Sequence, residues 1–171
     1  MIQFSIVPET IVHESAIEKL HADAFGPGRF ARAAFRLREQ GPHDPRLSFV
    51  AIGEGEDEAF LGSLRMTWIE TQATGARGLL LGPLAVLEEL KGQGIGKGLL
   101  RHAVDAAGRS GAGYILLVGD EPYYWPFGFH AVTPGAVVMP GPVDPKRLLV
   151  CTLQPDAPVP GGLVRWAEGA T

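Results

Sequence analysis

The chain has 171 residues, 46% hydrophobic and 20% charged, which predicts one globular domain with a buried core and excludes a disordered chain. Its 15 Lys and Arg against 19 Asp and Glu leave a net charge of −4, which argues against a protein that coats nucleic acid by neutralising phosphates. A single cysteine, no signal-peptide pattern and no apolar run near the ~18 residues of a membrane span predict a cytoplasmic protein without a disulfide.

The first 45 residues predict one short strand followed by two helices. Alternating apolar residues indicate a strand over residues 3–7, which Pro8 stops. Thr10 is a candidate N-cap for a helix that ends at Gly26-Pro27-Gly28. Apolar residues at helical spacing predict a second helix from Arg29 to about Gln40, and a loop follows it.

From residue 47 the apolar period changes to two, which predicts a series of strands. Gly82 and Pro83 lie inside one of them, and because proline lacks a backbone donor, they predict a bulge or a splayed strand. The continuous apolar run at residues 114–118 is typical of a buried central strand. The other strands are expected at residues 47–52, 59–70, 78–86, 129–139 and 148–153, with a long helix at 94–108 and a short helix at 121–127.

These elements predict a single α/β domain with a mixed α+β sheet over residues 1–155. Residues 156–171 are rich in proline and glycine and are predicted to form a loosely structured C-terminal tail.

The most informative stretch is the glycine-rich turn over residues 91–98, which follows a predicted strand and opens a predicted helix. Glycines let the backbone approach a ligand closely, and the free amides of a helix N-terminus bind anions. The turn fails the Walker pattern at Lys91 and Gly98, and it fails the dinucleotide fingerprint at Lys97 and Leu99. It therefore indicates a phosphorylated ligand of another class, or a glycine-rich connection without a ligand.

Three segments occur in the order Leu81-Gly-Pro-Leu-Ala-Val86, Lys91-Gly-Gln-Gly-Ile-Gly96, and Leu117-Val-Gly-Asp120 with Tyr123-Tyr124…Phe127-Gly-Phe129. Taken together they resemble the GCN5-related N-acetyltransferase family, and within it the predicted acetyltransferases of the YhbS type. The resemblance implies a single-domain acyl-CoA N-acyltransferase fold, with splayed central strands and helices on both faces. It also implies acetyl-CoA as co-substrate and no metal.

The resemblance assigns three roles. Tyr124, four residues before Gly128, would protonate the departing thiolate, although the neighbouring Pro126 can shorten its helix. Lys91 stands where the family carries Arg or Gln, so it keeps a positive charge and loses the planar fork of arginine. Backbone groups of Leu84, Ala85 and Val86 would bind the pantetheine and polarise the thioester, and the turn at Lys91, Gly92, Gln93, Gly94, Ile95, Gly96 and Lys97 would bind the pyrophosphate.

Other candidates stay open at this point. The proton of an attacking amine can pass to Glu70, Asp120, Glu121 or water, and each of these carboxylates also fits a solvated or capping role. Tyr123 is interpreted as a packing or substrate-wall residue, and the five histidines show no metal-ligand spacing. By analogy with the fold, the residues expected to wall an acceptor site are Phe25, Arg29, Phe30 and Arg32.

The predicted function is therefore an acetyltransferase that moves an acetyl group from acetyl-CoA to a small-molecule or peptide amine by direct attack in a ternary complex. Neither a nucleic acid nor a membrane is expected as partner, and a homodimer through an edge strand is left open. The alternative is a non-catalytic acyl-CoA-binding regulatory module. A nucleotide-binding domain is disfavoured by the failed motif matches.

Overall fold

The computed structural model describes residues 2–169, so residues 1, 170 and 171, at the ends of the predicted domain and tail, lie outside the described residues. The strands are β1 (Phe4–Pro8), β2 (Phe49–Gly53), β3 (Phe60–Thr71), β4 (Arg77–Val86), β5 (Tyr114–Val118), β6 (His130–Ala131), β7 (Val137–Val138), β8 (Leu148–Thr152) and β9 (Gly162–Trp166). The α-helices are α1 (Glu14–Phe25), α2 (Ala33–Arg38), α3 (Ile95–Gly108) and α4 (Glu121–Tyr124). Short 3-10 turns are η1 (Ile11–His13), η2 (Pro27–Ala31), η3 (Pro45–Leu47), η4 (Glu88–Leu90), η5 (Trp125–Phe127) and η6 (Pro145–Arg147).

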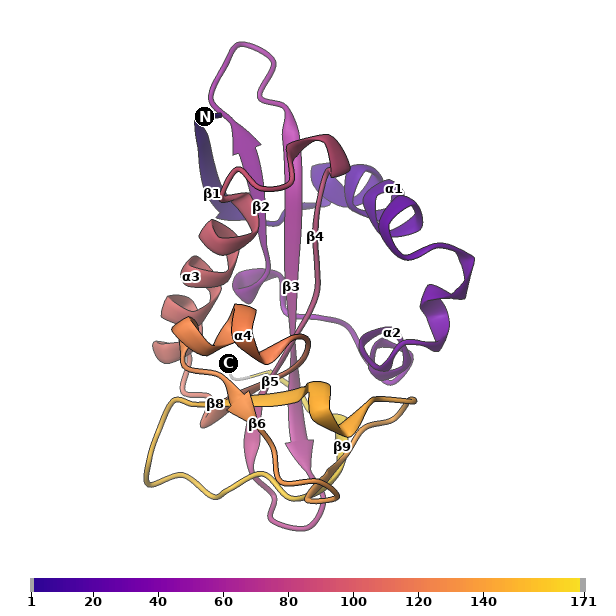
Figure 1. The fold of residues 1–171 in the computed structure, drawn as a ribbon, viewed down its shortest axis with the longest axis vertical. Coiled ribbons are helices and arrows are strands. Elements are labelled where there is room, and N and C mark those ends of the chain that lie inside the picture. Colours follow the sequence, from indigo (N-terminus) through magenta and orange to yellow (C-terminus); the bar gives the residue numbers. More distant parts are fainter. Residues whose placement is uncertain (1, 170–171) are drawn as a thin grey trace.

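The strands form a mixed sheet along the path β1-β2-β3-β4-β5-β8-β6, with β9 pairing β3 and β7. Figure 1 shows α3 on one side of the sheet and α1 and α2 on the other. The residues of β5 alternate between two cores: Ile115 and Leu117 pack in the core with α3, and Tyr114 and Leu116 pack in the core with α2. The predicted mixed sheet with helices on both faces is thereby confirmed.

The splayed strand expected at Gly82-Pro83 is present in β4. The peptide bond between these two residues is cis, and the register of β3 and β4 shifts between Leu64 and Met66, opposite this point. β5 runs parallel to β4 but pairs with it only at Leu79 and Leu80. Beyond Leu80 the two strands diverge, so residues 81–86 keep one edge of β4 free of any strand among the described residues.

The single helix predicted from Arg29 to about Gln40 is wrong, because Arg32 interrupts it. Residues 27–31 form η2, Arg32 is extended at ψ 148°, and α2 begins only at Ala33. The loop at Gly141 packs here, since a Cβ at that position would lie 3.2–3.4 Å from backbone atoms of Ala31 and Ala33. This tertiary contact has no signal in the local sequence.

The single strand predicted over residues 129–139 is also wrong. Pro134 and Gly135 form a turn there: the Ala136 amide donates to the Thr133 carbonyl at 3.0 Å, and Gly135 adopts φ +82°. The turn leaves only the two-residue strands β6 and β7, on either side of it.

The prediction of a loosely structured tail after residue 155 is wrong, because part of this segment forms β9. This strand pairs antiparallel with β3 and parallel with β7, and Val164 within it is fully buried. The indole of Trp166 donates to the Pro42 carbonyl at 2.9 Å. The alternation of Val164 and Trp166 with more exposed residues was the strand signal, which the surrounding prolines and glycines masked.

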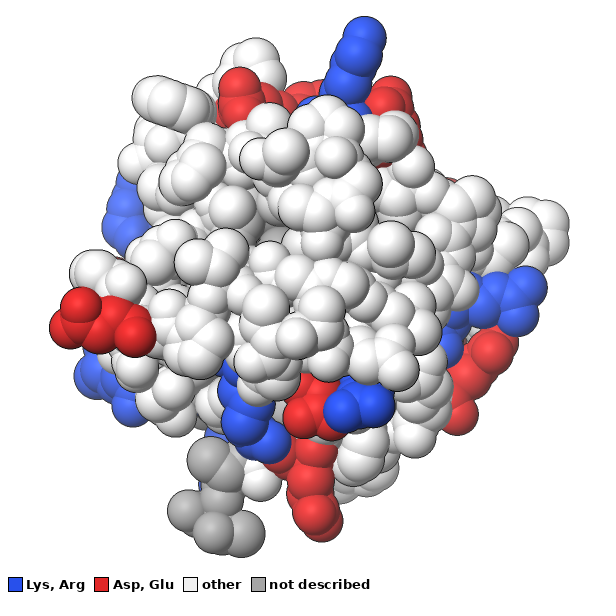
Figure 2. Space-filling model, turned by 90° about the horizontal axis from the view of Figure 1, so that it is seen from below, with Lys and Arg blue, Asp and Glu red and all other residues white. Residues whose placement is uncertain are grey.

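The surface that lies at the bottom of Figure 1 carries its charged side chains around the periphery. Figure 2 shows this face with uncharged residues across its middle and both signs of charge around its edge, without a continuous basic patch. No helix of the described residues combines the length and apolar composition needed to cross a membrane.

His21, on α1, makes stability depend on pH. Its ring is fully buried between Phe25 and Phe35, at centroid distances of 5.9 and 5.6 Å, and neither nitrogen has a hydrogen-bond partner. Burial, reinforced by the charge of Arg65, lowers the pKa of His21 to about 3. The unfolded chain, with a histidine pKa near ~6.5, therefore binds a proton that the folded chain does not, and folding stability falls as pH drops below ~6.5.

We expect the free energy of unfolding to fall by about 2–3 kcal/mol between about pH 6.5 and about pH 4.5 through His21 alone. The substitution His21→Phe keeps an aromatic ring against Phe25 and Phe35 and removes this titration. Urea unfolding of both proteins across that interval measures the difference. An equally steep loss in His21→Phe would contradict the assignment.

Candidate functional site

Two cavities meet at the divergence of β4 and β5. The glycine-turn cavity, of about 660 Å³, is lined by Leu84 to Val86 of β4 and by the turn over residues 90–97. The Arg32 cavity, of about 460 Å³, lies on the other side and is lined by the start of α2, by residues 80–84 in the middle of β4, by the end of β5 and by part of the loop between β7 and β8. The two cavities share Phe25, Leu84, Tyr123 and Tyr124.

The glycine turn opens α3 as predicted. Gly92 and Gly94 adopt φ +83° and +84°, a left-handed conformation that side chains other than glycine rarely adopt. A Cβ at either position would meet nothing within 4 Å, so this side of the turn is open. Gly94 caps the helix, and because the first amides of a helix lack intrahelical acceptors, those of residues 95–97 are free to bind an anion.

The charged and polar side chains of the turn have partners of their own. Lys91 is well exposed, and its Nζ lies 2.7 Å from Glu88 Oε2. Lys97 Nζ lies 6.0 Å from the centre of the Tyr123 ring. The Gln93 side chain accepts a hydrogen bond from the Ile2 amide at 3.2 Å, so it ties the turn to the start of the chain.

The three β4 residues whose backbone groups were predicted to bind a cofactor lie at the glycine-turn cavity. Leu84, Ala85 and Val86 pair with β3 along one edge and line the glycine-turn cavity. Because β5 has already diverged, no strand among the described residues occupies the other edge. Their backbone groups on that edge can pair with an extended ligand in the manner of an added strand.

Tyr124 lies at the junction of the two cavities. Its ring packs against Tyr123 and Phe129, at 4.9 and 6.0 Å between centroids, and a Cβ at Gly119 would collide with it. Burial, followed by the neighbouring Tyr123 and Asp120, raises the pKa of Tyr124 to about 12. The phenol is therefore protonated at neutral pH and available as a proton donor.

Tyr123 is the more exposed of the pair. Its hydroxyl lies 3.2 Å from the position that a Cβ would occupy at Gly96, so the side chain reaches across to the start of α3. Burial also raises the pKa of Tyr123. The wall role expected for it agrees with its place in both cavities.

Of the three carboxylates considered as bases, Asp120 alone lines a cavity among the described residues. Its Oδ1 accepts from Arg147 Nε at 3.2 Å. The Glu121 carboxylate accepts from the Ala131 amide at 2.6 Å and thereby holds β6. Glu70 pairs with Arg165 at 2.8 Å, where β3 meets β9.

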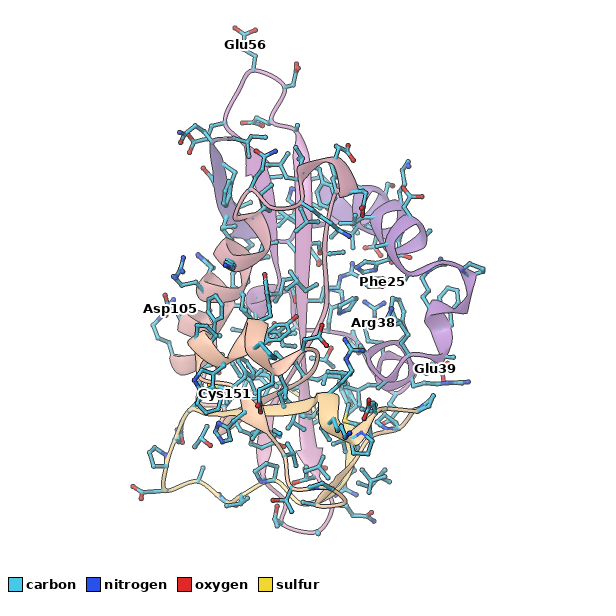
Figure 3. All side chains as sticks on the ribbon, viewed as in Figure 1. Phe25, Arg38, Glu39, Glu56, Asp105 and Cys151 are labelled. Atoms are coloured by element: carbon cyan, nitrogen blue, oxygen red, sulfur yellow. The ribbon has the colours of Figure 1, made fainter. Side chains whose placement is uncertain are left out.

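The structure places two of the four residues expected to wall an acceptor site at a cavity. Phe25 and Arg32 line the Arg32 cavity, whereas Arg29 and Phe30 do not. Figure 3 shows Phe25 between α1, α2 and β4. Sequence reasoning missed Asp144 and Arg147, which a loop brings to the cavity; the only local signal was Asp144-Pro145, where Asp144 caps η6 by accepting from the Lys146 amide at 3.0 Å.

Neither a thiol nor a metal cluster is found at the junction. Cys151, labelled in Figure 3, is buried on β8, lines neither cavity and has its thiol pKa raised by burial. Within residues 2–169 no group of three or more His, Cys, Asp or Glu side chains is placed to hold a metal ion.

The chain is similar to known proteins both in sequence and in structure. A family model described as the acetyltransferase (GNAT) family matches residues 15–124. The uncharacterized N-acetyltransferase YhbS of Escherichia coli (strain K12) is 24% identical over 121 residues, 71% of this chain and 70% of that protein. The crystal structure of YhbS from Escherichia coli in complex with CoA matches with a TM-score of 0.75 and 21% identity, covering 98% of this chain and 92% of that one.

A second solved structure has the same fold. It is a GNAT family acetyltransferase from Brucella melitensis in complex with acetyl-CoA, with a TM-score of 0.67 and 22% identity, covering 98% of each chain.

Proposed function

The chain belongs to the acetyltransferase (GNAT) family, and from this premise we propose that it transfers an acetyl group from acetyl-CoA to an amine by direct attack in a ternary complex. The observation that carries the proposal is the meeting of two cavities at Leu84 and Tyr124, one of them opening on the left-handed glycine turn. Two substrates can approach each other there from opposite sides. The proposal includes a cytoplasmic location, which fits a chain with one buried cysteine.

The glycine-turn cavity fits acetyl-CoA. In this proposal, amides at the start of α3 bind the pyrophosphate, and the free edge of residues 84–86 pairs with the pantetheine amides; the open helix start and the unpaired strand edge support these roles. Lys91 adds a positive charge near the turn, although Glu88 partly neutralises it. Two solved structures of the same fold are complexes with CoA and with acetyl-CoA, which supports acetyl-CoA as the ligand.

The residues at the junction supply the groups that the transfer needs. A backbone amide of the free β4 edge polarises the thioester carbonyl. Tyr124 donates a proton to the departing thiolate, and Asp120 or water takes the proton of the amine. Because a thiol has a pKa near ~8.5 and that of Tyr124 is about 12, proton donation is uphill and its contribution to the rate is modest.

Stabilisation by the cofactor tests the binding half of the proposal. At a hundred times its dissociation constant a ligand stabilises the folded state by ~2.7 kcal/mol, so acetyl-CoA and CoA should raise the Tm by roughly 5–10 °C. ATP, which carries phosphates without pantetheine, should produce a much smaller shift and tests the nucleotide-binding alternative. An unchanged Tm at millimolar acetyl-CoA would overturn the proposed function.

A further inference from the structure

The Arg32 cavity contains one cation that no carboxylate neutralises. Its four charged side chains are Arg32, Asp120, Asp144 and Arg147, and two of them form the 3.2 Å ion pair between Asp120 and Arg147. Among the described residues no carboxylate lies within 4.0 Å of the Arg32 guanidinium, and none of its N–H groups has a protein acceptor. A ligand that enters this cavity therefore meets unpaired guanidinium donors.

The backbone and one aromatic ring fix the position of Arg32. It is the extended residue between η2 and α2, where the loop at Gly141 packs. Its Cζ lies 4.6 Å from the centre of the Phe25 ring, a cation–π contact. His21 and Phe35 in turn hold that ring, at centroid distances of 5.9 and 6.4 Å.

Phe25 connects Arg32 with the junction of the two cavities. The ring lines both cavities, as Leu84 and Tyr124 do, and the Arg32 guanidinium lies against it. One small molecule that enters the Arg32 cavity can therefore contact Arg32 with one group and present an amine to the junction with another.

We propose that the acetyl acceptor is a free amino acid, bound by its carboxylate to Arg32 with its amine directed to the junction. This inference rests on the proposed function and specifies its acceptor. Arginine binds carboxylates through paired N–H donors, and a cavity of about 460 Å³ lies within the range of small-molecule sites.

The reaction balances for such an acceptor. A bond forms between the amino nitrogen and the acetyl carbon, and the bond between that carbon and the CoA sulfur breaks. One proton leaves the nitrogen and one reaches the sulfur, which gives an N-acetyl amino acid and CoA.

The test compares the standard amino acids with their carboxamides as acceptors, in the native protein and in Arg32→Gln. We expect kcat/KM for the best acid to exceed that for its amide by about 10- to 100-fold, as for one charge-assisted contact. Arg32→Gln should abolish this preference, with the loss carried by KM for the acid, while its acetyl-CoA affinity stays within a few fold. Arg36→Gln is the control, because Arg36 lies on α2, the helix that follows Arg32, pairs with Glu39 and lines neither cavity.

Three results would overturn the inference while leaving acetyl transfer intact: amides or peptide N-termini used as well as free acids, an acid preference that survives in Arg32→Gln, and no transfer to any amino acid by a protein that binds acetyl-CoA. Failure of the native protein to bind acetyl-CoA would instead overturn the proposed function.

Discussion

Gly94→Asp should lose acetyl-CoA affinity by at least ~100-fold while the protein stays folded. A Cβ at Gly94 would project into open space, so the new side chain has room, and its carboxylate would occupy the mouth of the anion site at the start of α3. There it would repel the pyrophosphate and accept hydrogen bonds from the amides that otherwise bind it. Losing two charge-assisted contacts of ~1.5 kcal/mol each already accounts for this factor.

Gly94→Asn is the matched control. Asparagine has the shape of aspartate and the same strain at φ +84°, but it carries no charge. Calorimetric titration with acetyl-CoA should show a much smaller loss for Asn than for Asp, with both proteins folded by circular dichroism. Native affinity in a folded Gly94→Asp variant would mean that the turn does not bind the pyrophosphate.

Tyr124→Phe should lower kcat by roughly 10- to 100-fold and leave acetyl-CoA affinity within a few fold. The substitution keeps the ring that packs against Phe129 and Gly119 and removes only the hydroxyl, which has no protein hydrogen-bond partner among the described residues. A pKa of about 12 makes this phenol a weak acid, so a larger loss is not expected. Steady-state kinetics with the best acceptor measure the effect.

Tyr123→Phe separates the two neighbouring phenols. Both side chains line the junction, and the Tyr123 hydroxyl lies beside Gly96, so the control removes a hydroxyl of similar position. We expect Tyr123→Phe to change kcat by only a few fold. Equal effects of the two substitutions, or full activity in Tyr124→Phe, would leave water as the proton source.

Much of the fold could be predicted because the composition of some segments indicates whether they are buried. The apolar run at residues 114–118 has the same bounds as β5, and Gly82-Pro83 indicated the divergence of strands that forms the site. The break at Arg32 and strand β9 could not be predicted in the same way, because contacts with distant segments decide them. Gly141 packs against the break, and β9 is held by β3 and β7.

The parts of the candidate site that are contiguous in sequence could be predicted, and the parts that come from distant segments could not. The glycine turn and the free edge of β4 are contiguous in sequence, so their geometry could be expected from residues 81–97. The choice of Asp120 over Glu70 required the structure, because the sequence places both near strand ends, and only the structure shows that Asp120 lines a cavity whereas Glu70 pairs with Arg165. Asp144 and Arg147 come from a loop whose sequence does not indicate which cavity it reaches.

Acetyl transfer itself is tested most directly by incubating the native protein with acetyl-CoA and a panel of amines that includes the amino acids and their carboxamides, and by measuring released CoA together with the mass of the acetylated product. We predict that one CoA is released for each acetylated amine, with little release when the amine is omitted. Tight acetyl-CoA binding without any acetylated product would contradict it and would identify the chain as a non-catalytic acyl-CoA-binding module.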